Sequence, residues 1–187
     1  MSFPGIPSLD AAVMAFIQTH FHNTVTDTVF PIITSLGEAG IGWIVLSLVL
    51  LCFKKTRRTG GLVLIAMTVT LLFGELTLKN IICRLRPCNV LTDFPMLIAR
   101  PTSYSFPSGH TSSSFAAALI LTLRHKKVGW LAYIPAVLIA FSRIFLFVHY
   151  PTDVLAGILL GTLAALLTYF AAKAIQKRQA EKRTAQI

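Results

Sequence analysis

The sequence VLAGILLGTLAALLTYFAA, residues 154–172, contains no Asp, Glu, Lys or Arg and decides the fold class. About 20 predominantly apolar residues cross the hydrocarbon core of a bilayer as one helix. The segment 153–172 is therefore predicted to span a membrane. The whole chain agrees, because 55% of its 187 residues are hydrophobic and only 13% are charged, about half the roughly 25% typical of soluble domains. We predict an all-α integral membrane protein.

Four further spans are predicted from stretches that carry few charges. They are residues 39–53, 60–83, 111–123 and 128–148. Only Glu75 and Lys79 interrupt the second of these stretches, and Arg143 lies near the end of the fourth. Each stretch is bounded by polar or basic residues, as expected for helices that end at the membrane surface.

The segment 1–38 contains no Lys or Arg. We therefore expect no cleavable signal peptide with a basic start. Apolar residues 11–17 precede Gln18 and His20, a pattern that suits a helix lying in the membrane interface. Residues 28–36 are too short to span alone, so they form either a re-entrant segment or part of a sixth span. We expect a bundle of about six membrane-embedded helices, with a core domain over 39–172 and a basic cytoplasmic tail over 173–187.

The net charge of +10, from 17 Lys and Arg against 7 Asp and Glu, is concentrated on one side of the predicted spans. Twelve basic residues fall in segments 54–58, 124–127 and 173–183. By the positive-inside rule this side is cytoplasmic, so the charge predicts a topology and not a nucleic-acid partner. The remaining five basic residues lie at or near the opposite face, where we expect them to hold an anion: Lys79, Arg84, Arg86, Arg100 and Arg143.

Two small-residue features each allow two interpretations. Cys83 and Cys88 either pair in an oxidising compartment or stay free, and three cysteines make neither a disulfide framework nor a zinc site. Gly157 and Gly161 form a Gly-x-x-x-Gly pattern, which indicates close helix packing inside the bundle or a homodimer interface.

A first polar group lies at the end of the span 60–83, where Lys79 is followed by Arg86-Pro87. Cations close to hydrocarbon are expensive and are functional candidates by default. The structural alternative is that Lys79 pairs with Glu75, four residues earlier on the same helix face, while Arg86 reaches lipid headgroups.

A second group, Pro107-Ser108-Gly109-His110, opens the span 111–123. Gly109 permits close backbone approach, and the free N–H groups of the following helix offer an anion site. His110 has a side chain suited to proton transfer near neutral pH. The structural alternative is a turn in which Ser108 caps the helix.

The third group is Ser142-Arg143, His149 and Asp153. A carboxylate that accepts a hydrogen bond from one imidazole nitrogen leaves the other nitrogen free as a nucleophile. Alternatively, Asp153 caps the span 153–172 and His149 faces water. Together the three groups bring cations, two histidines, a carboxylate and a helix N-terminus to one face, which indicates phosphoryl transfer. Metal binding is not expected, because carboxylates are scarce and cations crowd the site.

These three groups resemble, in order, spacing and placement, the motifs of the type 2 phosphatidic acid phosphatase superfamily. The resemblance implies a helical membrane core and a lipid phosphatase that needs no metal or other cofactor. It implies that His149 attacks phosphorus to form a phosphohistidine, that Asp153 orients it, and that His110 protonates the leaving oxygen and then helps to activate water. It assigns the phosphoryl oxygens to Lys79, Arg86, Ser108, Gly109 and Arg143.

The expected substrate is a lipid phosphate or diphosphate in a bacterial inner membrane, met at the outer face. Undecaprenyl diphosphate is favoured, because cell-wall assembly leaves it on that side, and phosphatidylglycerol phosphate and phosphatidic acid are the alternatives. A non-enzymatic protein that binds anionic lipids is a competing hypothesis, although it would need only the cations. A vanadate-holding haloperoxidase and a phosphatase of soluble sugar phosphates are weaker alternatives.

Overall fold

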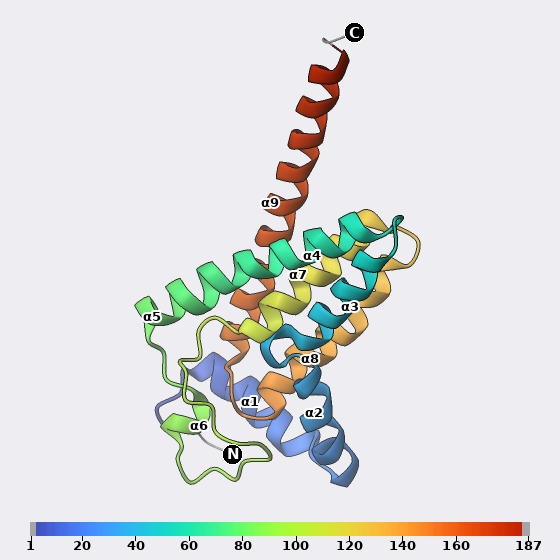
Figure 1. Cartoon of the computed structure of the whole chain (residues 1–187). Helices are drawn as coiled ribbons and strands as arrows, with labels where there is room; N and C mark the ends of the chain where they lie inside the picture. Colours follow the sequence, from blue (N-terminus) through green and yellow to red (C-terminus); the bar gives the residue numbers. More distant parts are fainter. Residues whose placement is uncertain (1–2, 185–187) are drawn as a thin grey trace.

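The computed structural model describes residues 3–184, and every regular element in this range is helical (Figure 1). The elements are α1 (Ser8–His20), α2 (Thr24–Leu36), η1 (Glu38–Gly40), α3 (Ile41–Cys52), α4 (Arg57–Thr70), the π-helical η2 (Leu71–Leu78), α5 (Lys79–Ile82), α6 (Pro87–Val90), α7 (Gly109–Arg124), η3 (Gly129–Ala132), α8 (Tyr133–Phe145) and α9 (Pro151–Thr184). The all-α prediction is confirmed within this range.

Helix α7 lies at the centre of the bundle and contacts α4, α8 and α9 (Figure 1). The close contact with α9 depends on Gly157 and Gly161, because a β-carbon at Gly161 would overlap the Ser112 carbonyl oxygen. On another side of α7, Trp43 of α3 donates a hydrogen bond from Nε1 to Ser114 Oγ at 2.9 Å. The glycine pair therefore serves packing within the bundle.

Two helical segments are long and apolar enough to cross a membrane: Arg57–Val90 and Pro151–Thr184. A third candidate is the pair Thr24–Leu36 and Glu38–Cys52, which is bent by 46°. Left-handed backbone angles at Ala39 and Gly40 make this bend. Helices occupy the positions predicted from the sequence, but the count of six membrane-embedded segments is not confirmed.

Helix α9 continues without a break past residue 172 to Thr184, and its last turns project beyond the other helices (Figure 1). The predicted basic tail is thus the exposed end of a spanning helix as far as Thr184, and residues 185–187 lie outside the described range. No packing partner restrains this end within the described residues, and its side chains are exposed.

Helix α1 forms where the sequence predicted a helix, and it packs beneath the turn between α8 and α9. Met14 and Ile17 join a buried cluster with Phe145 and Phe147. Gln18 Nε2 donates a hydrogen bond to the carbonyl oxygen of Phe145 at 2.9 Å. The N-terminal segment therefore covers the turn that carries His149, and its place in the membrane interface stays a prediction.

Candidate active site

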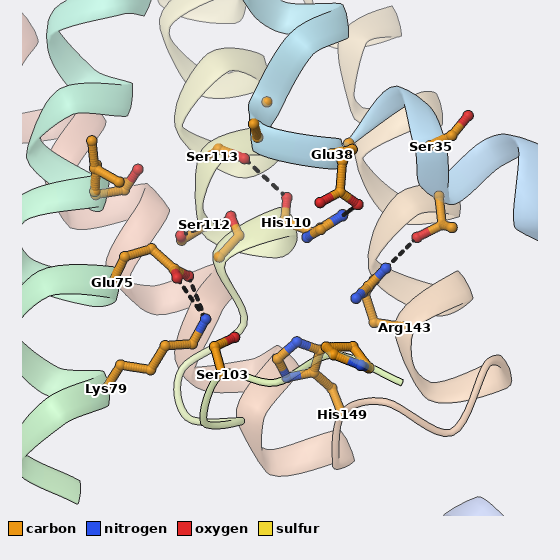
Figure 2. A pocket seen from close by; sticks show the side chains of 18 of the residues that line it. Ser35, Glu38, Glu75, Lys79, Ser103, His110, Ser112, Ser113, Arg143 and His149 are labelled. Atoms are coloured by element: carbon orange, nitrogen blue, oxygen red, sulfur yellow. Dashed lines mark hydrogen bonds and ion pairs between the residues drawn. The ribbon is translucent and has the colours of Figure 1, made fainter. Parts of the chain in front are cut away.

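A cavity of about 920 Å³ opens where the start of α5, the start of α7 and the end of α8 meet (Figure 2). The rest of its wall comes from helices α2, α3 and α4, the short helices η1 and η2, and the loop of residues 98–103. Six of the eight residues predicted from the sequence line it: Lys79, Arg86, Gly109, His110, Arg143 and His149. The fold thus brings together three motifs that are separated along the chain.

His149 lies in the turn between α8 and α9 and is 1% exposed. Its Nδ1 is 3.4 Å from Asp153 Oδ2, and its Nε2 is 2.9 Å from Nη1 of Arg86. A guanidinium group can only donate, so Nε2 must be the acceptor and Nδ1 must carry the proton. Burial, together with the charges of Arg86 and Arg143, lowers the pKa of His149 well below its usual value and keeps the ring neutral. Nε2 is therefore unprotonated, and it can act as a nucleophile once Arg86 releases its lone pair.

Asp153 is fully buried in the first turn of α9, where the helix dipole favours a negative charge. Its Oδ2 also accepts a hydrogen bond from the Tyr150 amide at 3.0 Å, and its Oδ1 accepts from Arg84 Nη1 at 2.6 Å. Both roles considered for Asp153 are consistent with this geometry, since the carboxylate stands at a helix start and also faces His149. The accompanying expectation that His149 faces water is wrong, because its side chain is buried.

The cations in the cavity wall keep donors available for an anion. Lys79 Nζ lies 2.7 and 2.6 Å from the two carboxylate oxygens of Glu75 (Figure 2). These two contacts use two of the three protons of the ammonium group and leave the third for a ligand. Arg143 donates from Nη1 to Thr34 Oγ1, while its buried Nε has no partner among the described residues. Preorganised donors of this kind stabilise the charge that develops on phosphoryl oxygens.

Helix α7 begins at Gly109, and Ser108 Oγ accepts a hydrogen bond from the Thr111 amide at 3.4 Å. A β-carbon at Gly109 would overlap the Glu75 carboxylate, so glycine allows this close approach. Ser108 itself is fully buried and its Oγ lies 2.9 Å from Thr111 Oγ1. The capping alternative for Ser108 is therefore observed, and its predicted contact with phosphate stays a prediction.

His110 lies across the cavity from His149 (Figure 2). Its Nε2 is 3.6 Å from Glu38 Oε2, which exceeds hydrogen-bond distance, and it has no other partner among the described residues. Glu38 was not identified from the sequence, because it lies in the N-terminal segment with no motif around it. His110 is placed to transfer a proton inside the cavity.

Two of the five basic residues expected to hold an anion bind the chain itself. Arg84 pairs with the carboxylates of Asp10 and Asp153. Arg100 also borders the cavity, but its guanidinium donates to the carbonyl groups of Cys88, Thr92 and Phe94. Of the five basic residues, we therefore keep only Lys79, Arg86 and Arg143 as the ones that hold an anion.

Asp10 was missed from the sequence, although one feature could have revealed it. It shares a helix face with Met14 and Ile17, and all three side chains are buried. An acidic residue on the apolar face of a helix is expensive unless it has a partner. The partner, Arg84, could not be named without the tertiary structure.

Cys83 is exposed, Cys88 is buried, and both are free thiols in the structure. Phe147 stacks on Phe94 with a ring separation of 3.8 Å and belongs to the core beside the site. Among the described residues, no group of three or more His, Cys, Asp or Glu side chains is placed to hold a metal ion. The expectation of a metal-independent reaction stays a prediction.

Residues 59–177, which carry all three motifs, match the model of the PAP2 superfamily. The chain belongs to the PAP2 superfamily. It is similar to an undecaprenyl-diphosphatase of Sulfolobus acidocaldarius, with 39% identity over 67% of this chain and 61% of that protein. It is also similar to the undecaprenyl-diphosphatase BcrC of Bacillus subtilis, with 31% identity over 79% of this chain and 76% of the relative.

The fold of this PAP2 protein is similar to the crystal structure of a transmembrane phosphatidylglycerolphosphate phosphatase from Bacillus subtilis. The TM-score is 0.72 at 30% identity, over 90% of this chain and 86% of the other. These findings confirm the family predicted from the motifs and agree with the expected hydrolase class. Helices α1, α2 and α3 lie outside the matched region of residues 59–177.

Proposed function

We propose that this PAP2 protein is a membrane lipid phosphatase that works through a phosphohistidine on His149. The observation that carries the proposal is the position of this neutral, buried imidazole between Asp153 and Arg86, at the wall of a cavity lined by further cations. An anion-binding site needs no oriented imidazole, whereas a covalent mechanism does.

The reaction proceeds in two displacements at phosphorus. His149 Nε2 attacks, the bond between phosphorus and the bridging oxygen breaks, and His110 gives its proton to that leaving oxygen. A water molecule then attacks phosphorus and loses a proton to His110, while the bond between phosphorus and His149 Nε2 breaks and inorganic phosphate is released. Lys79, Arg86, Arg143 and the Gly109 amide stabilise the equatorial oxygens in both steps.

The shape of the cavity supports a lipid as the substrate. Away from His149, it is lined by Ile44 of α3, Leu64 of α4 and Leu71 of η2. It follows α4 from Leu64 to Thr70, roughly 9 Å of α-helix at about 1.5 Å per residue, and continues along η2 to Glu75. Leu71 is 50% exposed on the membrane-spanning segment, so the apolar end reaches the side of the bundle. An apolar chain could lie there while its phosphate faces His149.

Among lipid phosphates we rank undecaprenyl diphosphate first and phosphatidylglycerol phosphate second. The ranking rests on the two undecaprenyl-diphosphatases among the relatives and on the phosphatidylglycerolphosphate phosphatase that shares the fold. Phosphatidic acid is the third candidate. The chemistry at phosphorus is the same for all three, so the lipid part of the cavity must make the choice.

The test is release of inorganic phosphate from these three lipids by the purified protein in mixed micelles. We expect release from at least one lipid, and none from a matched His149→Ala preparation. If neither protein releases phosphate but both bind the lipids, the protein is a non-enzymatic lipid-binding protein. If only soluble sugar phosphates are hydrolysed, the lipid assignment is wrong.

We further propose that the active site faces the outside of a bacterial inner membrane. The argument is the charge distribution, because twelve of the 17 Lys and Arg residues mark the side away from the motifs. Lys55 and Asp93 are exposed near the two ends of the bundle. In a cysteine-free background, an impermeant thiol reagent should label Asp93→Cys but not Lys55→Cys in sealed cells. The reverse pattern would place the site in the cytoplasm.

A further inference from the structure

A network of polar groups joins α1 to the active site through Asp153. Asp10 of α1 is 1% exposed, and its Oδ1 accepts a hydrogen bond from the Thr152 amide at 3.0 Å. Its Oδ2 accepts from Thr152 Oγ1 at 2.8 Å and from Arg84 Nη2 at 2.7 Å. Asp10 therefore satisfies a backbone N–H in the first turn of α9, which has no partner within its own helix.

Arg84 connects this network to the catalytic pair. Its Nη1 donates to Asp153 Oδ1 at 2.6 Å and to Thr152 Oγ1 at 2.7 Å, and its guanidinium lies 3.8 Å from the centre of the Tyr150 ring. The planar fork of an arginine is rigid, so contacts on both nitrogens define its orientation. A continuous chain of polar contacts thus runs from Asp10 through Arg84 and Asp153 to His149.

We propose that Asp10 and Arg84 are positioning residues that hold Asp153 in the orientation required by His149. The inference rests on the proposed function. Asp153 Oδ2 is shared between the Tyr150 amide and the imidazole, so the orientation of the carboxylate depends on the anchor at Oδ1. Asp10 accepts a hydrogen bond from the other terminal nitrogen of the guanidinium, Nη2. Without it, the full charge of Arg84 falls on Asp153 and weakens its hold on the Nδ1 proton.

The source of Asp10 gives α1 a role in catalysis. The superfamily match covers residues 59–177, which include Arg84, His149 and Asp153 but not Asp10. An element outside the matched region therefore completes the support of the nucleophile. Helix α1 reaches it because Met14 and Ile17, on the same face as Asp10, pack under the turn between α8 and α9.

The test compares Asp10→Asn with two control variants in the phosphate-release assay. Asp10→Asn keeps the side-chain shape but removes the charge. We expect kcat to fall about 10- to 100-fold, as is typical when a group that orients a catalytic ligand is lost. We expect little change in KM, because no contact to the phosphoryl-binding cations is altered.

The controls separate positioning from packing. Asp27→Asn makes the same chemical change in a carboxylate that pairs with His22 at 2.7 Å, away from the cavity, and should leave kcat unchanged. Met14→Ala weakens the packing of α1 and should lower the thermal midpoint with a smaller effect on kcat. If Asp10→Asn keeps wild-type kcat, or if Met14→Ala loses as much kcat as Asp10→Asn does, the positioning role is wrong.

A second readout does not depend on turnover. With ¹⁵N-labelled histidine, the His149 resonances among the five histidines can be assigned by their loss in His149→Ala. Asp10→Asn should shift the Nδ1 resonance of His149, and Asp27→Asn should not. If Asp10→Asn shifts the Nδ1 resonance but the wild-type protein releases no phosphate, the network is supported and the proposed function is refuted. An unchanged Nδ1 resonance in Asp10→Asn would overturn the inference even if the enzyme is active.

Discussion

Nη1 of Arg86 faces Nε2 of His149 at 2.9 Å, while Nδ1 of the same imidazole faces Asp153. The incoming phosphorus must approach Nε2, so the guanidinium has to move its donor from the nitrogen to a phosphoryl oxygen as the bond forms. Arg86 is held for this exchange by Nε and Nη2, which donate to the backbone oxygen and the hydroxyl of Ser103.

Arg86→Lys should therefore reduce kcat although it keeps the charge. A lysine ammonium cannot contact Ser103, Val148 and His149 together with the geometry of a planar fork. We expect a loss of about 10²- to 10³-fold, similar to that for one oxyanion donor in other enzymes. Phosphate release under saturating lipid measures it, and activity within threefold of wild type would contradict the exchange.

His149→Ala should abolish turnover while substrate binding largely survives. The cations that hold the phosphoryl group remain, but the nucleophile is gone, and such losses reach several orders of magnitude. Turnover is measured by phosphate release, and binding by competition with inorganic phosphate. Near-normal turnover in this variant would rule out the phosphohistidine, and trapping of a labelled phosphoenzyme in wild type would support it directly.

Asp153→Asn distinguishes a catalytic carboxylate from a helix cap. Asparagine can still accept from the Tyr150 amide, so the variant should fold, with a lower thermal midpoint because the buried ion pair with Arg84 is lost. An amide can present its NH₂ group to His149 and favour the wrong tautomer, and in the Ser-His-Asp triad the corresponding change costs about 10⁴-fold. Thermal unfolding and kcat are measured on the same preparation. Full activity would leave capping as the role of Asp153.

The reaction should proceed in the presence of a chelator and should be inhibited by vanadate. Lys79, Arg86 and Arg143 supply the positive charge at the cavity wall, and vanadate imitates the trigonal-bipyramidal phosphoryl centre. Loss of phosphate release in EDTA, restored by magnesium, would contradict this expectation. Vanadium found in the untreated protein would instead favour the haloperoxidase alternative.

Gly161→Ala should lower the stability of the bundle. The new methyl group would overlap the Ser112 carbonyl oxygen, and strain of this kind typically costs about 1–3 kcal/mol. Gly61→Ala in α4 is the matched control, because a β-carbon there meets nothing within 4 Å and alanine favours a helix by up to about 1 kcal/mol. Thermal unfolding in detergent measures both. Equal thermal midpoints for the two variants would mean that α7 and α9 move apart to accommodate the methyl group without a loss of stability.

The positions of the helices and the main site residues could be predicted from the sequence because both are encoded locally. A charge-free stretch such as 154–172 is unfavourable in water and has the length of one membrane crossing, so a helix is predicted there, although α9 itself continues to Thr184. Lys79, His110 and His149 stand at the ends of such stretches. Helices that alternate across a membrane must bring these ends to the same face.

The tertiary structure alone decided which side chains from other parts of the chain contact these site residues. Asp10 and Arg84 are separated along the chain and belong to no common motif, so their 2.7 Å contact depends on how α1 packs under the turn after α8. The bend at Ala39 likewise brings Glu38 to His110. Hydrophobic periodicity indicates that a helix face is buried but not against what, because burial of apolar surface is not directional. The partners of Asp10 and Glu38 therefore follow from packing, which is a property of the whole chain.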